Sequence, residues 1–275
     1  MARVIRLVVR VRQKRYPGAT RPALEALEMS AAAGEIVGIV GPSGCGKSTL
    51  LGIVAGLDRA FEGSVEVDGR PIHDVADPRV VPVRLGMMFQ ASRLMPWLTV
   101  LDNLRLVLGR DPAATARARR LLHDVGLEET ADAYPGRLSG GMQRRVALAR
   151  AFAVEPELLL LDEPLVSLDA PTASRLRRHL VELWQGTRPA VLYVTHELRE
   201  ALAVADRVLF LSPGPGRVVL ELPVGLARPR EPGDAAVGAL HDRILQQHPE
   251  ILAGAAAEPA DDLGIAPDDD GRSAR

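Results

Sequence analysis

The chain has 275 residues, of which 47% are hydrophobic and 25% charged, so it can bury a sizeable core without metal or disulfide staples. This composition is typical of a globular protein and excludes a mostly disordered chain. No apolar run approaches the ~20 residues of a membrane-spanning helix. Arg6 and Arg10 interrupt the N-terminal apolar stretch, which excludes the continuous apolar core of a secretory signal. We therefore expect a cytoplasmic protein.

Charge is nearly balanced overall but uneven along the chain. The formal net charge is −1, yet residues 254–275 hold six acids and two arginines, which leaves +3 on residues 1–253. So small a positive charge excludes the strongly basic face of a nucleic-acid-binding protein, and we expect no nucleic-acid partner. Residues 1–24 carry seven basic groups and no acid. We interpret these groups as one solvated face of a strand.

Two residue types are scarce in the chain. Cys45 is the single cysteine, which excludes an internal disulfide and a metal site built from cysteines alone. Only Lys14 and Lys47 are lysines among the 34 basic residues. Because the chain otherwise uses arginine for positive charge, we expect a lysine to have a specific task.

The first half of the chain predicts short strands and two helical regions. Residues 2–12 alternate apolar and basic side chains, which is typical of a half-buried strand. The apolar run 35–40 predicts a further strand, and apolar residues at helical spacing predict a helix over 48–57. Residues 63–90 predict short strands and turns, and residues 98–153 predict a mainly helical region.

The second half of the chain continues the alternation of strands and helices. The predicted elements are a strand over 158–161, a helix over 172–184, a strand over 190–194, a helix over 197–205, a hairpin over 207–222 and a weak helix over 237–247. The Ala/Asp/Pro-rich tail from residue 254 is predicted to be disordered. Apolar strands that alternate with helices, around a helical insertion, favour an α/β nucleotide-binding architecture.

A glycine-rich loop follows the strand predicted over 35–40. It matches the phosphate-binding pattern G-x-x-x-x-G-K-[ST] with Gly41, Pro42, Ser43, Gly44, Cys45, Gly46, Lys47 and Ser48. Glycines let backbone N–H groups surround phosphate oxygens, and the next helix presents its positive end. We predict that Lys47 reaches the β- and γ-phosphates of a nucleotide and that Ser48 ligates Mg²⁺; we include Thr49 among the nucleotide-binding residues. Cys45 is interpreted as a small packing residue.

Three further apolar runs end in polar residues: Gln90, the pair Asp162 and Glu163, and His196. Because the carboxyl ends of parallel strands meet at one edge of a sheet, we expect these residues to lie beside the glycine-rich loop. We predict that Asp162 holds Mg²⁺, that Gln90 orients Mg²⁺ or water, and that His196 contacts the γ-phosphate. Glu163 is predicted as the general base for the attacking water. Each residue alone fits an ordinary loop, but their coincidence favours function.

A second glycine cluster precedes another predicted helix. Ser139 is a good N-cap, and Gly140 and Gly141 expose backbone donors at the helix start, which is the arrangement of an anion site. A plain capped helix is the alternative. Two glycines in a first turn disfavour a helix, so we favour the anion site.

These motifs make residues 1–225 resemble the ATP-binding subunit of ABC transporters. The segment 138–142, with the sequence LSGGM, looks like the signature motif of that family. Four further matches support the resemblance. They are Tyr16 to the aromatic residue that stacks on adenine, Gln90 to the Q-loop glutamine, residues 166–169 to the D-loop and His196 to the switch histidine.

The resemblance implies an α/β fold, namely a P-loop NTPase ABC-type ATPase domain with an antiparallel β subdomain and a helical subdomain. The ATPase domain is expected over residues 1–225, with its helical subdomain over about 91–155. Residues 226–253 are expected to form a C-terminal extension, and residues 254–275 the acidic tail.

In that family the signature motif of one subunit covers the ATP bound by the P-loop of the other subunit. The resemblance therefore implies a head-to-tail homodimer, or a dimer with a closely related ATPase subunit, that holds two ATP molecules with Mg²⁺. It also implies nucleotide contacts from Ser139, Gly140, Gly141 and Asp169. The common form of the motif ends in glutamine, whereas this chain has Met142, which leaves the backbone donors unchanged.

Several stretches are similar to one branch of the family, the importers of nitrate, sulfonate, taurine or bicarbonate. They are residues 89–90 with 94–100, the LSGGM variant, and residues 211–217. This similarity implies an ATP-hydrolysing subunit that powers the uptake of a small anion through separate permease subunits. A substrate-binding protein is implied indirectly, as is a peripheral position at the cytoplasmic face of the membrane. The substrate is left open, because the ATPase never needs to touch it.

Three other classes fit the sequence less well. A DNA-maintenance ATPase of the ABC type carries a very long coiled coil between P-loop and signature, whereas Gly41 and Ser139 lie only 98 positions apart here. A soluble ABC protein of translation usually has two ATPase cassettes, and this chain has one P-loop. A P-loop kinase or GTPase lacks the cluster at 138–142.

An apolar cluster of Leu94, Met95, Trp97 and Leu98 lies within residues 92–104. It is conspicuous because the chain has only nine aromatic residues. Two interpretations stay open at this point. The cluster packs into the local core, or it forms a docking surface for the membrane partner.

Overall fold

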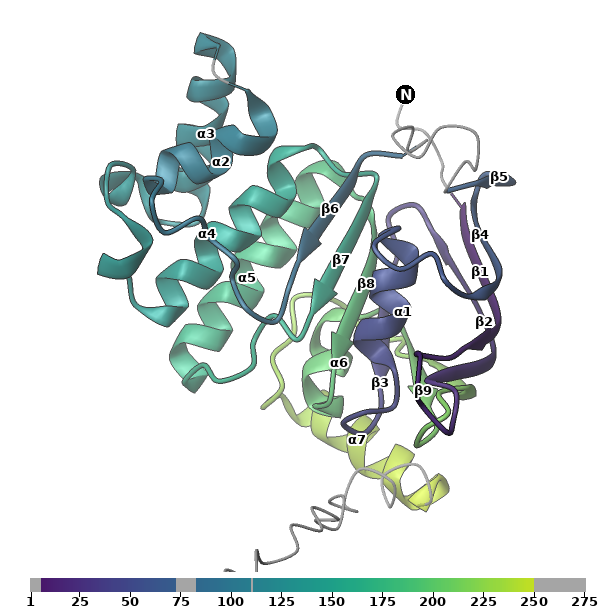
Figure 1. Cartoon of the computed structure of the whole chain (residues 1–275). Helices are drawn as coiled ribbons and strands as arrows, with labels where there is room; N and C mark the ends of the chain where they lie inside the picture. The colour runs from purple at the N-terminus through teal and green to yellow at the C-terminus, as the bar shows by residue number, and fades with distance from the viewer. Residues whose placement is uncertain (1–5, 73–82, 110, 250–275) are drawn as a thin grey trace, which may run out of the picture.

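The computed structural model describes residues 6–72, 83–109 and 111–249, which form two sheets with helices around them (Figure 1). The larger sheet has six strands in the order β10-β9-β3-β8-β7-β6. All are parallel to their neighbours except β10, which pairs antiparallel with β9. The strands are β3 Ile36–Val40, β6 Leu85–Met88, β7 Leu158–Asp162, β8 Ala190–Thr195, β9 Arg207–Leu211 and β10 Val218–Pro223.

The central strands are buried on both faces, as parallel strands usually are. Successive side chains of a strand point to opposite faces, so the residues of β3 divide between two cores. Val37 and Ile39 pack in a core with helix α1 and the smaller sheet, whereas Ile36 and Val40 pack in the core on the other face. Helix α1 Lys47–Val54 contributes to the first core. The helices α4 Gly140–Ala153, α5 Ala170–Thr187 and α6 Leu198–Val204 are among those that contribute to the second.

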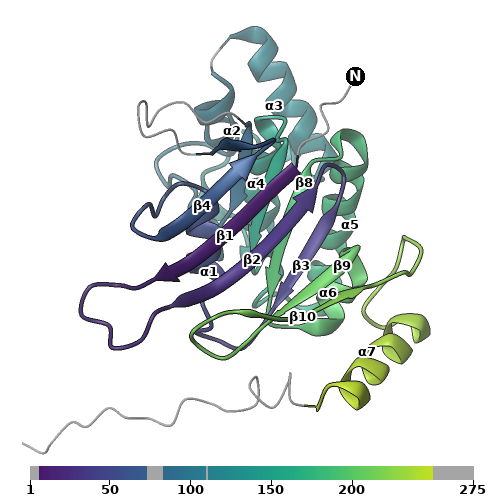
Figure 2. The ribbon, with the colours of Figure 1, turned by 90° about the vertical axis from the view of Figure 1, so that its right-hand side faces the viewer.

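The smaller sheet is antiparallel, in the order β2-β1-β4-β5, and covers the α1 side of the larger sheet (Figure 2). Its strands are β1 Arg6–Lys14, β2 Leu24–Ala32, β4 Glu62–Val67 and β5 Arg70–Pro71. The sequence patterns did not predict β2. Its buried residues Leu27, Met29 and Ala31 lie two positions apart, as expected of a strand. Leu24 is also buried but falls outside this alternation, because Ala26, between Leu24 and Leu27, has a positive φ of 47°.

Arg10 and Arg12 of β1 face acids on β4, whereas Lys14, at the end of the strand, is buried and does not belong to the solvated face. Arg10 Nη1 lies 3.8 Å from Glu66 Oε1, and Arg12 Nε donates a 2.9 Å hydrogen bond to Glu62 Oε2. These side chains are largely exposed, and such pairs contribute about 0–1 kcal/mol each. The pairing agrees with a solvated strand face. Residues 2–5 of the predicted first strand lie outside the described residues.

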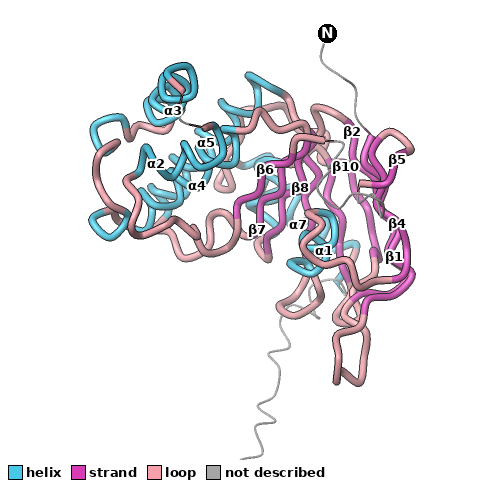
Figure 3. The backbone as a smooth tube through the Cα atoms, turned by 45° about the horizontal axis from the view of Figure 1, so that its top comes forward, coloured by secondary structure: helices cyan, strands magenta, loops and turns pink. Residues whose placement is uncertain are grey.

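The chain between β6 and β7 is mainly helical, which confirms the prediction for residues 98–153. Thr99, Asp111 and Ser139 each cap the helix that follows by accepting a hydrogen bond from a backbone N–H. The helices of this region gather at one end of the sheets (Figure 3). They are α2 Val100–Leu108, α3 Pro112–Asp124, the 3-10 helices Glu128–Thr130 and Pro135–Arg137, and α4.

Two helices differ in length from their predictions. Helix α1 ends at Val54 rather than at residue 57, because Gly56 has a φ of 73° and the carbonyl of Gly52 accepts the N–H groups of Leu57 and Asp58. Helix α5 starts at Ala170 and reaches Thr187, three residues beyond the prediction. The other predicted elements of the second half lie within two residues of the observed bounds.

The C-terminal segment packs against the core beside α6. Helix α7 (Ala235–Gln247) buries Val237, Leu240 and Ile244 in the same core as α6. Arg228 and Arg230 donate to backbone carbonyls at the C-terminal end of α6, where partial negative charge favours cations. Burial lowers the pKa of Arg230 to about 10, which still leaves it charged at neutral pH.

The acidic tail over residues 254–275, predicted to be disordered, lies outside the described residues. Within the described ranges, no helix is both long enough and apolar enough to span a bilayer.

Candidate functional site

The glycine-rich loop joins the end of β3 to the start of α1, as the pattern requires. Gly44 and Gly46 have φ values of 77° and 100°, in the left-handed region that glycine adopts without strain. Lys47 is only 6% exposed, and its Nζ donates hydrogen bonds to the carbonyls of Gly41 (2.7 Å) and Pro42 (2.9 Å). The ammonium group is therefore held inside the curve of the loop.

Cys45 fills space inside this loop. It is 1% exposed, and a Cβ atom on Gly41 would lie 2.8 Å from Cys45 Sγ. Burial raises the pKa of the Cys45 thiol, although the nearby charge of Lys47 opposes this shift. A buried neutral thiol is inert, which agrees with a packing role.

Asp162 lies at the end of β7, opposite the first turn of α1. Ser48 Oγ donates a hydrogen bond of 3.2 Å to Asp162 Oδ1. Asp162 is 7% exposed, and its burial raises the pKa of the carboxyl group, a shift that the Ser48 bond opposes. A hydroxyl and a carboxylate oxygen thus lie together beside the loop, and these are the ligand types that Mg²⁺ prefers.

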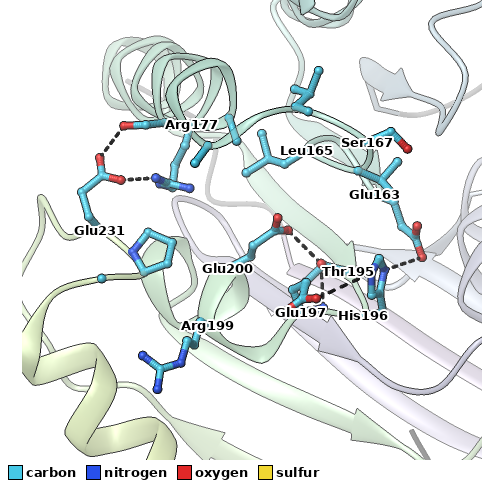
Figure 4. Close-up of a pocket in the computed structure, with 17 residues that line it drawn as sticks. Glu163, Leu165, Ser167, Arg177, Thr195, His196, Glu197, Arg199, Glu200 and Glu231 are labelled. Carbon is cyan, nitrogen blue, oxygen red and sulfur yellow. Dashed lines mark hydrogen bonds and ion pairs between the residues drawn. The ribbon is translucent and has the colours of Figure 1, made fainter. Parts of the chain in front are cut away.

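Glu163 is the point where three strand ends converge. Its Oε1 lies 3.4 Å from Nδ1 of His196, which follows β8, and its Oε2 accepts a 3.3 Å hydrogen bond from Gln90 Nε2, which follows β6. Figure 4 shows Glu163 and His196 directed toward one another. Glu163 is 16% exposed, so its carboxylate reaches solvent at the surface of the site. The structure thus brings together the polar residues predicted at strand ends.

A pocket of about 630 Å³ opens beside Glu163 and His196, lined also by residues 165–168 and by α5 (Figure 4). Burial raises the pKa of the Glu200 carboxyl group in its wall, where Thr195 Oγ1 donates to Glu200 at 2.9 Å. Glu231, from the C-terminal segment, closes another side by accepting hydrogen bonds from α5. Glu200 and Glu231 carry no motif, and the sequence patterns did not indicate them.

Tyr16 lies next to the first turn of α1, with its hydroxyl 3.1 Å from Thr49 Oγ1. Its ring is 43% exposed, which leaves an aromatic face open to solvent. Lys14 is 3% exposed, and its Nζ lies 4.5 Å from the centroid of the Tyr16 ring. Asp58 Oδ1 accepts a 2.7 Å hydrogen bond from the same ammonium group. Lys47 is the first residue of α1, whereas Lys14 contacts Asp58, which follows the end of that helix.

The second glycine cluster begins α4 as predicted, but its two glycines differ. Ser139 Oγ accepts a hydrogen bond from the N–H of Met142 at 3.2 Å. A side chain on Gly141 would collide with the methyl group of Thr172 on α5, so packing alone requires this glycine. Gly140 has open space around it, so packing does not explain its presence. Two glycines in the first turn lower the stability of the helix. Packing explains the glycine at position 141 but not the one at position 140.

Asp169 caps α5. Its Oδ1 accepts a 3.0 Å hydrogen bond from the N–H of Thr172, and the hydrogen bonds from Thr172 lower the pKa of the Asp169 carboxyl group. Among the described residues, no hydrogen bond or ion pair joins Asp169 or the signature segment to the glycine-rich loop of the same chain. Helices α4 and α1 contribute to the cores on opposite faces of the large sheet, and Figure 1 shows them apart.

Three arginines of α4 donate to backbone carbonyls of three separate loops. Arg144 reaches Glu163 and Pro164, Arg145 reaches Val125 and Gly126, and Arg150 reaches Ser92 and Arg93. Burial lowers the pKa of each guanidinium. The sequence patterns did not predict these contacts. Every residue has a backbone carbonyl, so the residue types of a loop do not show which carbonyl accepts a hydrogen bond.

The segment after Gln90 is tightly held, yet Trp97 points outward. Buried Asn103 donates to the carbonyls of Met95, Leu98 and Thr99, and accepts the N–H of Met95. Leu94 packs against the core, whereas Trp97 is 70% exposed. Core packing is therefore excluded for Trp97, and the docking interpretation remains for it.

Fold and site together define a class of protein. A G-x-x-x-x-G-K-S loop follows a central parallel strand, and acidic and polar residues end the neighbouring strands, which is the arrangement of a P-loop ATPase. The chain belongs to the ABC transporter family, whose model matches residues 24–166. It is therefore an ATP-binding ABC-type ATPase, as the motifs predicted.

Individual relatives match most of the chain. An aliphatic sulfonates import ATP-binding protein of Burkholderia cenocepacia (strain HI2424) is 44% identical over 254 residues, which cover 92% of this chain and 91% of that protein. One of Cupriavidus pinatubonensis (strain JMP 134 / LMG 1197) is 45% identical over 234 residues, with 85% and 74% covered. These relatives confirm the predicted branch.

Solved structures give the same fold. A dimeric ATP-binding cassette in a post-hydrolysis state, bound to ADP and Pi, superposes with a TM-score of 0.71 at 31% identity. The match covers 80% of this chain and 100% of that one. A second dimeric structure of the same bacterial ABC transporter cassette gives a TM-score of 0.72 at 32% identity, with the same coverage. The predicted ABC-type fold is thereby confirmed.

Proposed function

We propose that this chain is the ATP-hydrolysing subunit of an importer for aliphatic sulfonates. The observation that carries the ATPase part is the convergence of Gln90, Glu163 and His196 beside the P-loop. The sulfonate part is supported by the relatives, which are named for aliphatic sulfonate import. Nitrate, taurine and bicarbonate are the other small anions that the branch suggested.

ATP is proposed to bind across the start of α1. The backbone N–H groups of the loop over 41–49 surround the phosphates, and Lys47 is placed to exchange its carbonyl partners for phosphate oxygens. The half-exposed ring of Tyr16 stacks on adenine, with Lys14 beneath it. The nucleobase and the triphosphate thus use different ends of one surface.

Mg²⁺ is proposed to accompany the nucleotide. Ser48 and Asp162 present oxygen ligands that are already close together, and the amide oxygen of Gln90 is a third candidate. So few protein ligands fit this ion, which is usually bound through one or two carboxylates plus phosphates and water. Bound there, Mg²⁺ neutralises charge on the phosphates.

Glu163 is proposed as the general base. Its carboxylate accepts a proton from the attacking water as the water oxygen bonds to the γ-phosphorus and the ADP oxygen leaves. Gln90 and His196, both within 3.4 Å of that carboxylate, orient the water and contact the γ-phosphate. The three residues act from three adjacent strands, which fixes their relative positions.

Two copies of the chain, or one copy and a closely related subunit, are proposed to form a head-to-tail dimer. Each copy presents Ser139, Gly140, Gly141 and Asp169 to the ATP held by the other P-loop. The opposite placement of α1 and α4 in one chain supports this assignment. The similarity to a cassette that two solved structures show as a dimer supports it as well.

Permease subunits are proposed as the membrane partners, and a substrate-binding protein as the indirect one. The chain then sits peripherally at the cytoplasmic face of the membrane. The exposed side chain of Trp97, on a segment fixed by Asn103, supports a docking surface within residues 92–104. The domain limits follow from the same proposal, with the ATPase domain over 1–225 and an extension over 226–253.

Growth of the source cell tests the substrate. A strain lacking this chain is supplied with an alkanesulfonate as its only sulfur source, and is complemented with the wild-type chain or with Glu163→Gln. We expect growth with the wild-type chain alone, while all strains grow on sulfate. Taurine is an amino-substituted sulfonate, so it is tested separately from the unsubstituted alkanesulfonates. If the deletion strain grew normally on several unsubstituted alkanesulfonates but failed with taurine as sulfur source or nitrate as nitrogen source, the substrate would be reassigned to the compound on which growth failed.

A further inference from the structure

Glu163 has a backbone conformation that costs energy. Its φ is 45°, in the left-handed region that residues with a side chain rarely adopt. Such a conformation persists only where the surrounding structure holds it. On the N-terminal side, the N–H of Glu163 donates a 2.9 Å hydrogen bond to the carbonyl of Val194 on β8. On the C-terminal side, the N–H of Val166 donates a 3.3 Å hydrogen bond to the carbonyl of Glu163, and a side chain adds a second donor.

Arg144 of α4 is this second, charged donor. Its Nη1 donates to the carbonyl of Glu163 at 3.3 Å and to that of Pro164 at 3.1 Å, so it spans the peptide group that follows the strained residue. Burial lowers the pKa of Arg144 and the charge of Glu163 opposes the shift, so the guanidinium keeps its charge at neutral pH. A charged donor makes these bonds stronger than neutral ones.

The neighbouring residue offers a natural comparison. Arg145 lies on the same helix and also gives Nη1 to two consecutive carbonyls, those of Val125 and Gly126. These carbonyls lie at the end of α3, outside the cluster of strand ends. The two arginines therefore share helix, chemistry and bond pattern, and differ in which loop they hold.

We propose that Arg144 is a positioning residue for hydrolysis. Through the carbonyls of Glu163 and Pro164, it fixes the backbone that aims the Glu163 carboxylate at the attacking water. Arg144 itself touches neither nucleotide nor water in this role. The inference rests on the proposed function of Glu163 as general base, and it adds a residue of the signature helix to the hydrolytic machinery.

The test compares Arg144→Gln with Arg145→Gln in the full chain. Steady-state ATPase rates, ATP affinity by calorimetry and the melting temperature are measured for both variants. We expect Arg144→Gln to lower kcat about tenfold to a hundredfold with KM and ATP affinity within twofold, since a misplaced catalytic group affects rate rather than binding. Arg145→Gln is expected to keep kcat within twofold, whatever its melting temperature.

Arg144→Lys keeps the positive charge and part of the reach, so it is expected to restore a part of the lost kcat. If Arg144→Gln does not fold, the comparison is made between Arg144→Lys and Arg145→Lys, with a lower kcat expected for the former alone. Equal kcat values within either pair would overturn the inference, even where melting temperatures differ.

Glu163→Gln separates this inference from the function on which it rests. Turnover near wild type in Glu163→Gln would reject the general base, and the role of Arg144 with it. Loss of turnover in Glu163→Gln, combined with equal rates for Arg144→Gln and Arg145→Gln, would reject Arg144 alone. Loss in both Glu163→Gln and Arg144→Gln, with Arg145→Gln active, is the expected result.

Discussion

Lys47 occupies the centre of the phosphate-binding loop, where its ammonium group already meets two backbone carbonyls. We expect Lys47→Ala to weaken ATP binding at least tenfold, because the β- and γ-phosphates lose a point charge. Titration calorimetry measures the affinity, and the melting temperature without nucleotide shows whether the loop still folds. An affinity within about threefold of wild type would show that the loop does not act as a P-loop.

Lys14 is the second lysine, and its ion pair with Asp58 is mostly buried. We expect Lys14→Met to destabilise the fold by about 2 to 4 kcal/mol, because Asp58 loses its positively charged partner and, among the described residues, keeps only the backbone N–H of Ala60. The double variant Lys14→Met/Asp58→Asn removes both charges and is expected to recover part of this loss. Chemical denaturation gives the free energies of unfolding, and equal values for the single and double variants would contradict the prediction.

At the scale of elements, the strand ends of the large sheet were predictable, whereas β2 was not. Gln90, Glu163 and His196 each follow an apolar run, and the rule that parallel strands end at one edge places them together. The buried residues of strand β2 do not alternate regularly, because Ala26 has a positive φ. Nothing in the sequence indicates that an alanine adopts this backbone conformation. Patterns in sequence report side-chain alternation and not backbone dihedrals.

The carbonyl contacts of α4 were beyond prediction for a related reason. Arg144, Arg145 and Arg150 look like the polar face of a helix, yet each binds backbone oxygens far away in the chain. Every residue has a carbonyl, so residue type does not identify the acceptor. The same holds for Gly141. This position has no room for a side chain because Thr172, on another helix, fills the space.

The segment between β6 and α2 has its own prediction. We expect Trp97→Ala to leave the ATPase rate of the isolated chain within twofold of wild type, and to lower transport by the assembled importer at least fivefold. The physical reason is the loss of a large exposed apolar side chain, of the kind that anchors protein interfaces.

The control for Trp97→Ala is Val219→Ala, which removes an apolar side chain that is 54% exposed on the edge strand β10. Reconstituted vesicles that contain the permease subunits give the transport rate, and the free chain gives the basal rate. Equal transport for the two variants would rule out docking through Trp97.

On the scale of the whole molecule, α1 and α4 contribute to opposite cores, so one chain presents two helix starts that do not face each other. We expect ATPase activity to return when a Lys47→Ala chain is mixed with a Gly140→Asp chain. Gly140→Asp places an anion where phosphate is proposed to lie at a helix N-terminus, and Gly140 has room for the side chain. A mixed dimer then holds one site with both elements intact.

Turnover of each variant alone and of the mixture is measured at concentrations where dimers form. Each variant alone is expected to be inactive, and coupling between sites can keep the mixture below half of the wild-type rate. A verified mixed dimer without any activity would argue against sites shared between chains. Two tags, one on each variant, allow the mixed dimer to be purified before the assay.

The burial of both lysines has a consequence for chemistry on the surface of this protein. Lys14 and Lys47 are 3% and 6% exposed, and every other basic side chain is arginine or histidine. Reagents that acylate amines therefore meet a folded protein whose lysine side chains are shielded, while its positive surface charge stays intact. The rate at which Lys47 is acylated, measured by mass spectrometry, therefore reports how often the phosphate loop opens. Bound nucleotide should slow this acylation. The same shielding leaves lysine acetylation without an accessible target on the described surface of the native fold.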